Sequence, residues 1–377
     1  MTKIYTSAFS GDNGVTSVSI PDSVTDIGTY LFGANETITS VTVGKGITAI
    51  PLSTFVNAKN LKEVTFAGDI VSIGDDAFKG CAALKEFAFP ATLETIGQNA
   101  FSESGIVKVV LPDTVTSIGQ SAFYGCLSLT SVTLGKGITS IPNNAFQQCR
   151  ALQEIKFLGD VTSFGNYVFY YCSSLRYLYL PASVVTIGTY FLSNASDKCI
   201  IFAEAAEKPA GWSSSWNVKD LPVIYNANKE IGPHFVDDLM YLVVDENTVT
   251  FRGNYSSEQN LTIPDKVTID GKEYQVASVA DKASYIAYNL YTLTTGEALK
   301  TIGQQSFYNC YNLYTLNLGT GITAIGDSAF ASCRSLRTIN YAGTMEEWGK
   351  ISLGENWKQG TNYYLTSVVC SDGTVEL

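Results

Sequence analysis

Eight cysteines are the residues of this 377-residue chain whose type and spacing could do chemistry. Six of them occupy one position of a repeating pattern, while Cys199 and Cys370 lie outside it. Because the 23-residue spacing stacks neighbouring thiols in a column with parallel side chains, we expect buried free thiols that pack as small hydrophobic groups. A disulfide is the alternative; zinc is disfavoured, because the chain has no Cys-x-x-Cys and one histidine. The six are Cys81, Cys126, Cys149, Cys172, Cys310 and Cys333.

The histidine and the paired carboxylates do not resemble catalytic residues. His234 stands in Ile-Gly-Pro-His-Phe, where we expect a structural or solvated role. Pairs such as Asp75-Asp76 and Glu346-Glu347 are adjacent in sequence, whereas glycoside hydrolysis needs two carboxyls that face one cleft. We therefore predict no catalytic residue, no metal and no cofactor, and we predict that the chain is not an enzyme.

The composition disfavours two classes of partner. The net charge is −11 and the pI is near 4.7, so phosphate backbones and anionic headgroups repel the chain. Hydrophobic residues make up 45% of the sequence, but no apolar run reaches the roughly 18 residues of a membrane span. We expect no nucleic acid, no membrane insertion within this chain, and a monomer.

A repeat of about 23 residues determines the expected fold. It begins with an aliphatic residue that opens a short strand, continues to an internal aliphatic residue, and ends with an aromatic residue in a tight turn. The opening residues are Val15, Ile38, Leu61, Leu84, Ile106, Leu129, Leu152 and Leu175; the internal ones run from Ile27 to Ile187; the aromatic ones are Phe32, Phe55, Phe78, Phe101, Phe123, Phe146 and Phe169, with Leu192 in the eighth unit.

Such a unit exposes an apolar interior at both ends and must stack on its own copies. The pattern predicts a mainly β, right-handed solenoid of parallel strands about 4.8 Å apart, with short helical or 3₁₀ turns that carry the aromatic residue. One unit has 22 residues, and the missing residue falls in the turn between Phe101 and Ile106. Ile4 and Phe9 keep the register before the first full unit, so we expect a chain truncated in mid-repeat at its N-terminus.

A second, longer period indicates duplication of a four-repeat block. The Gly-Lys-Gly turn at 44–46 recurs at 135–137, an offset of 91 residues. Neither turn is a phosphate loop, because no Walker pattern surrounds it. Duplicated positions cannot mark a unique binding site, so specificity should lie where the blocks differ.

The pattern predicts three segments. Residues 1–225 form the first array with its truncated repeat, eight repeats and a cap containing two Trp in Gly-Trp-x-x-x-Trp-Asn. Residues 226–277 form a β-hairpin-rich insert, marked by the Asp270-Gly271 turn. Residues 278–377 form a second short array, in which Leu290, Leu313 and Leu336 restore the period before a C-terminal cap with Trp348 and Trp357.

The motif Leu-x-x-Val-x-Leu-Pro-x-x-Val-Thr-x-Ile-Gly-x-x-Ala-Phe-x-x-Cys, nearly intact from Val109 to Cys126, resembles the BspA-like leucine-rich repeats. The likeness covers nearly the whole chain and implies a leucine-rich-repeat solenoid. Relatives in this family are mostly surface or secreted proteins of host-associated bacteria, and some are adhesins. The family has no shared catalytic residues to carry over.

The candidate ligand-binding surface lies near the end of the first array. The strand Leu175-Arg-Tyr-Leu-Tyr-Leu180 presents aromatic residues where its duplicate, Leu84-Lys-Glu-Phe-Ala-Phe89, presents charged and small ones. Tyr and Arg are enriched in binding hot spots, although Tyr also simply covers strand surface next to a cap. A similar group in the second array is Tyr308, Tyr311 and Tyr314. The predicted surface comprises Arg176, Tyr177 and Tyr179, with both strand tyrosines facing solvent, and Tyr167 and Tyr171 from the preceding turn.

Two functions are compatible with this surface. The first is a non-enzymatic, extracellular or cell-surface module that binds a host protein or glycan through the solenoid face. The second is a stalk that presents another domain and binds nothing itself.

Overall fold

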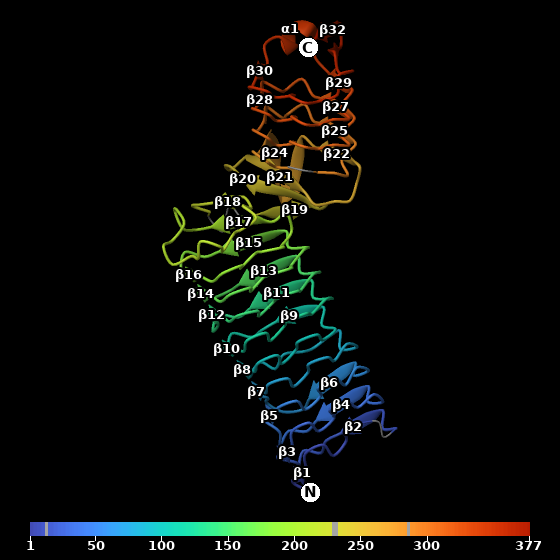
Figure 1. The fold of residues 1–377 in the computed structure, drawn as a ribbon, viewed down its shortest axis with the longest axis vertical. Helices are drawn as coiled ribbons and strands as arrows, with labels where there is room; N and C mark the ends of the chain where they lie inside the picture. Colours follow the sequence, from blue (N-terminus) through green and yellow to red (C-terminus); the bar gives the residue numbers. More distant parts are fainter. Residues whose placement is uncertain (12–13, 228–232, 285–286) are drawn as a thin grey trace. The chain divides into compact units, whose positions relative to one another are not determined.

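The computed structural model describes residues 1–11, 14–227, 233–284 and 287–377. The chain forms two compact units, Met1–Ala227 and Asn228–Leu377, which we call unit 1 and unit 2 (Figure 1). Each is a coil of short strands with its hydrophobic core inside. In the described residues, no helix is long and apolar enough to cross a membrane.

Most repeats of unit 1 contribute one strand to each of two rows. Within each row the paired strands are parallel, and equivalent residues of neighbouring repeats lie in register, as Val132 does with Ile155. The first row contains β2 (Ser17–Ser19), β4 (Ser40–Val43), β6 (Glu63–Phe66), β9 (Lys108–Val110), β11 (Ser131–Leu134), β13 (Glu154–Phe157), β15 (Tyr177–Leu180), β17 (Ile200–Ala203) and β18 (Val223–Ile224). The second contains β1 (Lys3–Ile4), β3 (Asp26–Ile27), β5 (Ala49–Ile50), β7 (Ser72–Ile73), β8 (Thr95–Ile96), β10 (Ser117–Ile118), β12 (Ser140–Ile141), β14 (Ser163–Phe164) and β16 (Thr186–Ile187). The predicted mainly β solenoid is confirmed.

A column of stacked phenylalanine rings fills the core of unit 1. From Phe9 to Phe169, consecutive rings have centroids 5.0–5.9 Å apart and planes within 12° of parallel. The stack ends where Phe169 meets the edge of Phe191, at an interplanar angle of 73°. Leu192 is also buried, so the predicted inward position is confirmed in the eighth repeat.

The turns that carry these rings are not helical, which corrects the expectation of helical or 3₁₀ turns. Two residues in each turn adopt a left-handed conformation, as Asn144 (φ 58°) and Gln148 (φ 61°) do on either side of Phe146. Positive φ values at this spacing prevent a helical run. In the described residues the single helix is α1 (Met345–Trp348). It begins with a capping box between Thr344 and Glu347.

The first row of strands is interrupted at Leu84–Phe89, which the repeat pattern predicts as a strand. No strand forms there, and the row restarts at β9. Phe87 replaces the smaller inward residue of other repeats, such as Val64 and Val109. Its ring lies 5.0 Å from the ring of Phe78 and 4.9 Å from that of Phe101. We attribute the lost pairing to this larger ring, which needs more room than the strand spacing leaves.

Two tryptophans are buried at the end of the second strand row of unit 1. Trp212 forms a parallel bridge with Ile187 and donates its indole N–H to the carbonyl of Val184 at 3.3 Å. Trp216 packs against it, with ring centroids 4.7 Å apart, and both are buried.

Unit 2 also has two sheets. One consists of β19 (His234–Val236), β20 (Leu239–Val243), β21 (Thr248–Asn254), β23 (Lys266–Ile269), β24 (Lys272–Val279), β26 (Thr301–Ile302), β28 (Ala324–Ile325) and β30 (Ser352–Leu353). The other consists of β22 (Asn260–Ile263), β25 (Thr292–Thr295), β27 (Thr315–Leu318), β29 (Thr338–Tyr341), β31 (Ser367–Cys370) and β32 (Gly373–Glu376). Trp348 and Trp357 are buried at the end of this array.

The hairpin-rich segment shares these sheets with the array that follows it. The predicted hairpin is confirmed, since β23 pairs antiparallel with β24 around Asp270 and Gly271, both with positive φ. Its second strand then pairs in parallel with β26, and β22 pairs in parallel with β25. Strands β19 to β24 thus lie in the same sheets as the second array. The division of the sequence into three segments remains a proposal.

Candidate ligand-binding surface

Strand β15 positions the three residues at the centre of the predicted surface. Leu178 and Leu180 point into the core and are fully buried, so the alternation of a strand turns Tyr177 and Tyr179 outward. Arg176 immediately precedes the strand, and its backbone N–H donates to the carbonyl of Gln153 at 3.0 Å.

The prediction that both tyrosines face solvent is wrong in part, because each is half-buried beside a carboxylate. The hydroxyl of Tyr179 donates to Oε1 of Glu204 at 2.6 Å, and Oε2 of Glu204 accepts from the backbone N–H of Ala182. Burial, with the neighbouring Glu154 carboxylate, raises the pKa of Tyr177 to about 12. Burial and the bond to Glu204 raise the pKa of Tyr179 well above its ordinary value. Strand β17 pairs with β15, and the ring of Phe202 in β17 lies edge-on to the ring of Tyr177, with centroids 6.4 Å apart.

The other two predicted residues belong to a cluster of tyrosines in the turns. Tyr167 stacks on Tyr190, with ring centroids 5.3 Å apart, and meets Tyr170 edge-on at 5.5 Å. Tyr170 in turn contacts the ring of Tyr171 at 4.5 Å. Tyr171 is 39% exposed and Tyr190 is 43% exposed, so the cluster presents aromatic surface to solvent.

The sequence pattern did not predict three residues that belong to this region, Tyr190, Glu154 and Glu204. Tyr190 lies 23 residues after Tyr167, so applying the repeat period to tyrosines would have found it. Glu154 and Glu204 come from the neighbouring repeats, where each stands as an ordinary surface carboxylate. No sequence signal marks which tyrosine each would approach.

The cysteines are free, as predicted, and all eight are buried. The repeat thiols lie near backbone carbonyls of an adjacent repeat; Cys81 Sγ is 3.1 Å from the carbonyl oxygen of Phe55, and Cys149 Sγ is 3.1 Å from that of Phe123. Burial raises the pKa of Cys199 to about 12 and that of Cys172 well above its ordinary value. Cys172 and Cys199 therefore carry little nucleophilic thiolate at neutral pH.

The histidine and the adjacent carboxylates considered in the sequence analysis lie beside other polar groups of the fold. His234 lies in β19, with Nδ1 3.8 Å from Oδ2 of Asp270. Asp75 accepts a hydrogen bond from the backbone N–H of Gln98, and Glu346 pairs with Lys350 at 2.7 Å. Among the described residues, no group of three or more His, Cys, Asp and Glu is placed to hold a metal ion.

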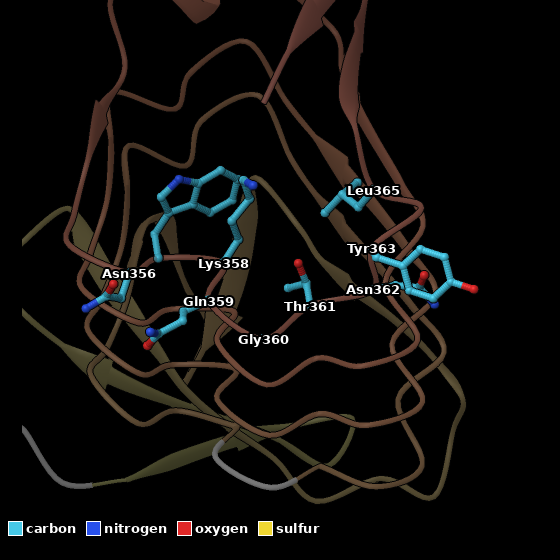
Figure 2. A pocket seen from close by; sticks show the side chains of 9 residues that line it. Asn356, Lys358, Gln359, Gly360, Thr361, Asn362, Tyr363 and Leu365 are labelled. Atoms are coloured by element: carbon cyan, nitrogen blue, oxygen red, sulfur yellow. The ribbon is translucent and has the colours of Figure 1, made fainter.

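Among the described residues, surface hollows lie away from the predicted residues. One, of about 470 Å³, lies in unit 1 at the 22-residue repeat, where Gly105, Tyr124 and Leu127 line it. The other, of about 420 Å³, lies in the closing loop of unit 2 and is lined by Asn356, Gln359, Asn362 and Tyr363 among others (Figure 2). Its lining carries polar amide groups rather than acid–base pairs.

Comparison with known proteins identifies similar chains. A leucine-rich repeat protein from Bacteroides ovatus is 23% identical, over 94% of this chain and 86% of its own, with a TM-score of 0.49. A leucine-rich repeat protein from T. pallidum is 30% identical, over 43% of this chain and 79% of its own, with a TM-score of 0.42. A leucine-rich cell surface protein from Faecalibacterium prausnitzii is 20% identical, over 90% of this chain and 91% of its own, with a TM-score of 0.35. No curated protein matches.

The family model for the BspA-type leucine-rich repeat region matches residues 1–107, 94–208 and 251–356, which together make up most of the chain. These ranges contain the repeats whose strands and phenylalanine column are described above. The chain therefore belongs to the BspA-type leucine-rich repeat family.

Proposed function

We propose that this chain is a non-enzymatic binding module, secreted or displayed on a bacterial surface, that recognises an extracellular protein or glycan through the solenoid face. Family membership supports the class of protein, because repeat solenoids present extended surfaces to partners. The observation that carries the binding role is the exposed tyrosine cluster at the end of the repeats of unit 1, next to β15 in sequence.

The proposed contact surface comprises Arg176, Tyr177, Tyr179, Tyr167 and Tyr171. Tyrosine offers contact area and a hydroxyl with little rotamer entropy to lose. Because Tyr177 and Tyr179 are held beside carboxylates, we assign the adaptable contacts to Arg176 and the turn tyrosines. The rings of Tyr177 and Tyr179 then provide a preorganised contact surface, because their positions are already fixed before a ligand binds.

The test is capture of matrix proteins and mucin glycans by the immobilised chain, followed by affinity measurement for any retained ligand. The variant is Arg176→Ala with Tyr171→Ser, and the control is Lys85→Ala, because Lys85 holds the position of Arg176 in the duplicated block. We expect the variant to lose about tenfold in affinity and the control to lose little. An unchanged affinity in the variant would remove this surface from consideration.

The alternative is a stalk that binds nothing itself. A chain that retains no ligand, while its melt shows it fully folded, would favour that alternative over the binding module.

A further inference from the structure

A second aromatic surface lies in unit 2, built from tyrosines that stack across repeats. The rings of Tyr288 and Tyr311 have centroids 5.6 Å apart and planes 14° from parallel. Three residues further along each repeat, Tyr291 and Tyr314 stack at 5.3 Å and 8°. Tyr288 is 54% exposed and Tyr291 is 46% exposed, so the two stacks lie on the surface.

Two arginines continue these stacks. The guanidinium of Arg334 lies 5.5 Å from the ring centre of Tyr311. That of Arg337 lies 5.5 Å from Tyr314 and 5.2 Å from Tyr364. Such cation–π contacts orient the guanidinium groups. We call the surface formed by Tyr288, Tyr291, Tyr311, Tyr314, Arg334, Arg337 and Tyr364 the tyrosine–arginine ladder.

The ladder is locally positive in an acidic chain. Within the described residues, neither guanidinium lies within 4.0 Å of a carboxylate oxygen. The segments 288–291, 311–314 and 334–337 contain no acidic residue, although the whole chain carries a net charge of −11. A row of hydroxyls and unpaired guanidinium groups therefore complements an anionic partner.

Packing alone does not require these residues. In unit 1 the position of Tyr311 and Arg334 is held by Lys59, Ala82, Gly105, Leu127, Arg150 and Ser173 in successive repeats. None of these is aromatic, yet unit 1 forms the same coil. Aromatic and cationic residues at consecutive repeats of unit 2 thus point to a ligand rather than to the fold.

The spacing of the ladder favours a polysaccharide. Its rungs, the tyrosine rings and guanidinium groups of successive repeats, lie 5.3–5.6 Å apart, close to the strand spacing. An extended peptide places side chains on one side about every 6.6 Å, which does not match. A linear chain of pyranose sugars advances by close to one strand spacing per sugar, so successive sugars can meet successive rungs. Carboxylates on such a chain would pair with the forked N–H groups of arginine.

The hollow of Figure 2 adjoins the ladder and offers groups for sugar hydroxyls. Tyr363 lines it, and the ring of Tyr363 lies 4.1 Å from that of Tyr364. Asn356, Gln359 and Asn362 supply amides that can both donate to and accept from a hydroxyl. We propose that the tyrosine–arginine ladder and this hollow form a binding site for a linear uronate-containing polysaccharide. The site is distinct from the surface proposed in unit 1 and stands even if that surface binds nothing.

Calorimetric titration of the full chain tests the proposal with three oligosaccharides. Oligogalacturonate, of plant origin, has a carboxylate on every sugar; hyaluronan oligosaccharide, of animal origin, has one on every second sugar; a cello-oligosaccharide of equal length has none. We expect binding of one or both uronates, weakened by added salt, and no binding of the neutral chain. Which uronate binds more tightly distinguishes the source.

The variant is Arg334→Gln with Arg337→Gln, and the matched control is Arg150→Gln, which changes the position of Arg334 in unit 1. Melts confirm that each variant folds, and Tyr288→Ser with Tyr291→Ser provides a second test at the other end of the ladder. We expect both ladder variants to lose about tenfold or more in uronate affinity, and the control to bind as the parent does. Absence of uronate binding, equal binding of the neutral chain, or unchanged affinity in the ladder variants would each overturn the proposal.

Discussion

At the scale of single residues, the phenylalanine column shows what one side chain contributes to this fold. The ring of Phe123 stacks between Phe101 and Phe146, with centroids 5.5 Å away on each side, and it is fully buried. Its contacts therefore connect three consecutive repeats.

We predict that Phe123→Ala lowers the free energy of unfolding by about 3–5 kcal/mol, because it removes ring contacts and leaves a cavity that fixed strands cannot fill. Denaturant unfolding measures the loss. The control is Leu127→Ala in the same repeat, whose side chain is 57% exposed and should cost less than about 0.5 kcal/mol. A loss below about 1 kcal/mol for Phe123→Ala would mean that the column does not stabilise the array.

The raised pKa of Tyr177 leads us to predict that the free energy of unfolding falls at alkaline pH. In the unfolded chain its hydroxyl ionises near its ordinary pKa of 10, whereas in the folded chain burial and Glu154 raise that pKa to about 12. Its contribution is therefore fully present below pH 10 and is lost as the pH rises toward 12, because ionisation then favours the unfolded state. Thermal melts from pH 8 to pH 12 should show a smaller decline for Tyr177→Phe than for the parent. Parallel declines would contradict the assigned cause.

At the scale of elements, the first strand row of unit 1 is interrupted after β6 and restarts at β9. Strand β11 pairs with β9 on one side and with β13 on the other. Residues 86–89, in contrast, form no backbone–backbone hydrogen bond with either neighbouring repeat. Residues 86–89 are therefore held by side-chain packing, whereas β8 of the same repeat pairs with both β7 and β10.

Hydrogen exchange tests this difference. We predict that the amides of Glu86, Phe87 and Ala88 exchange at least tenfold faster than those of Ser131, Val132 and Thr133, the equivalent residues of β11, because the former lack backbone acceptors. Mass spectrometry of peptides covering the two segments provides the measurement under identical conditions. Equal protection would show that a regular strand forms at 86–89.

At the scale of the whole molecule, buried thiols report on unfolding. Seven cysteines lie in the interior of the two units, and Cys370, in β31, is 8% exposed. Since β31 pairs antiparallel with β32, local opening of this pairing would expose this thiol first.

We predict that one thiol, Cys370, reacts slowly with a thiol reagent in native buffer and that the other seven react only when denaturant unfolds the chain. Mass spectrometry identifies the modified residue, and Cys370→Ser serves as the control that should remove the native reaction. Rapid native labelling of the repeat cysteines would contradict the buried column.

The sequence by itself determined the repeat, the mainly β solenoid, the inward phenylalanines and the hairpin at Asp270-Gly271. These follow from it because each repeat carries its own hydrophobic pattern and can bury that pattern only against a copy of itself. The same local signals predict the buried free thiols, and all eight cysteines are free and buried.

Only the tertiary structure decided features that depend on neighbours one repeat or more away. The large ring of Phe87 prevents the pairing of a predicted strand. Glu204 binds Tyr179, which the alternation of the strand alone would turn toward solvent. The turns that were expected to be helical contain residues in the left-handed conformation. The tyrosine–arginine ladder arose in the same way, from rings 23 residues apart. A pattern in sequence specifies which face a side chain occupies, but the volume and charge of the stacked neighbour determine how much of it reaches solvent.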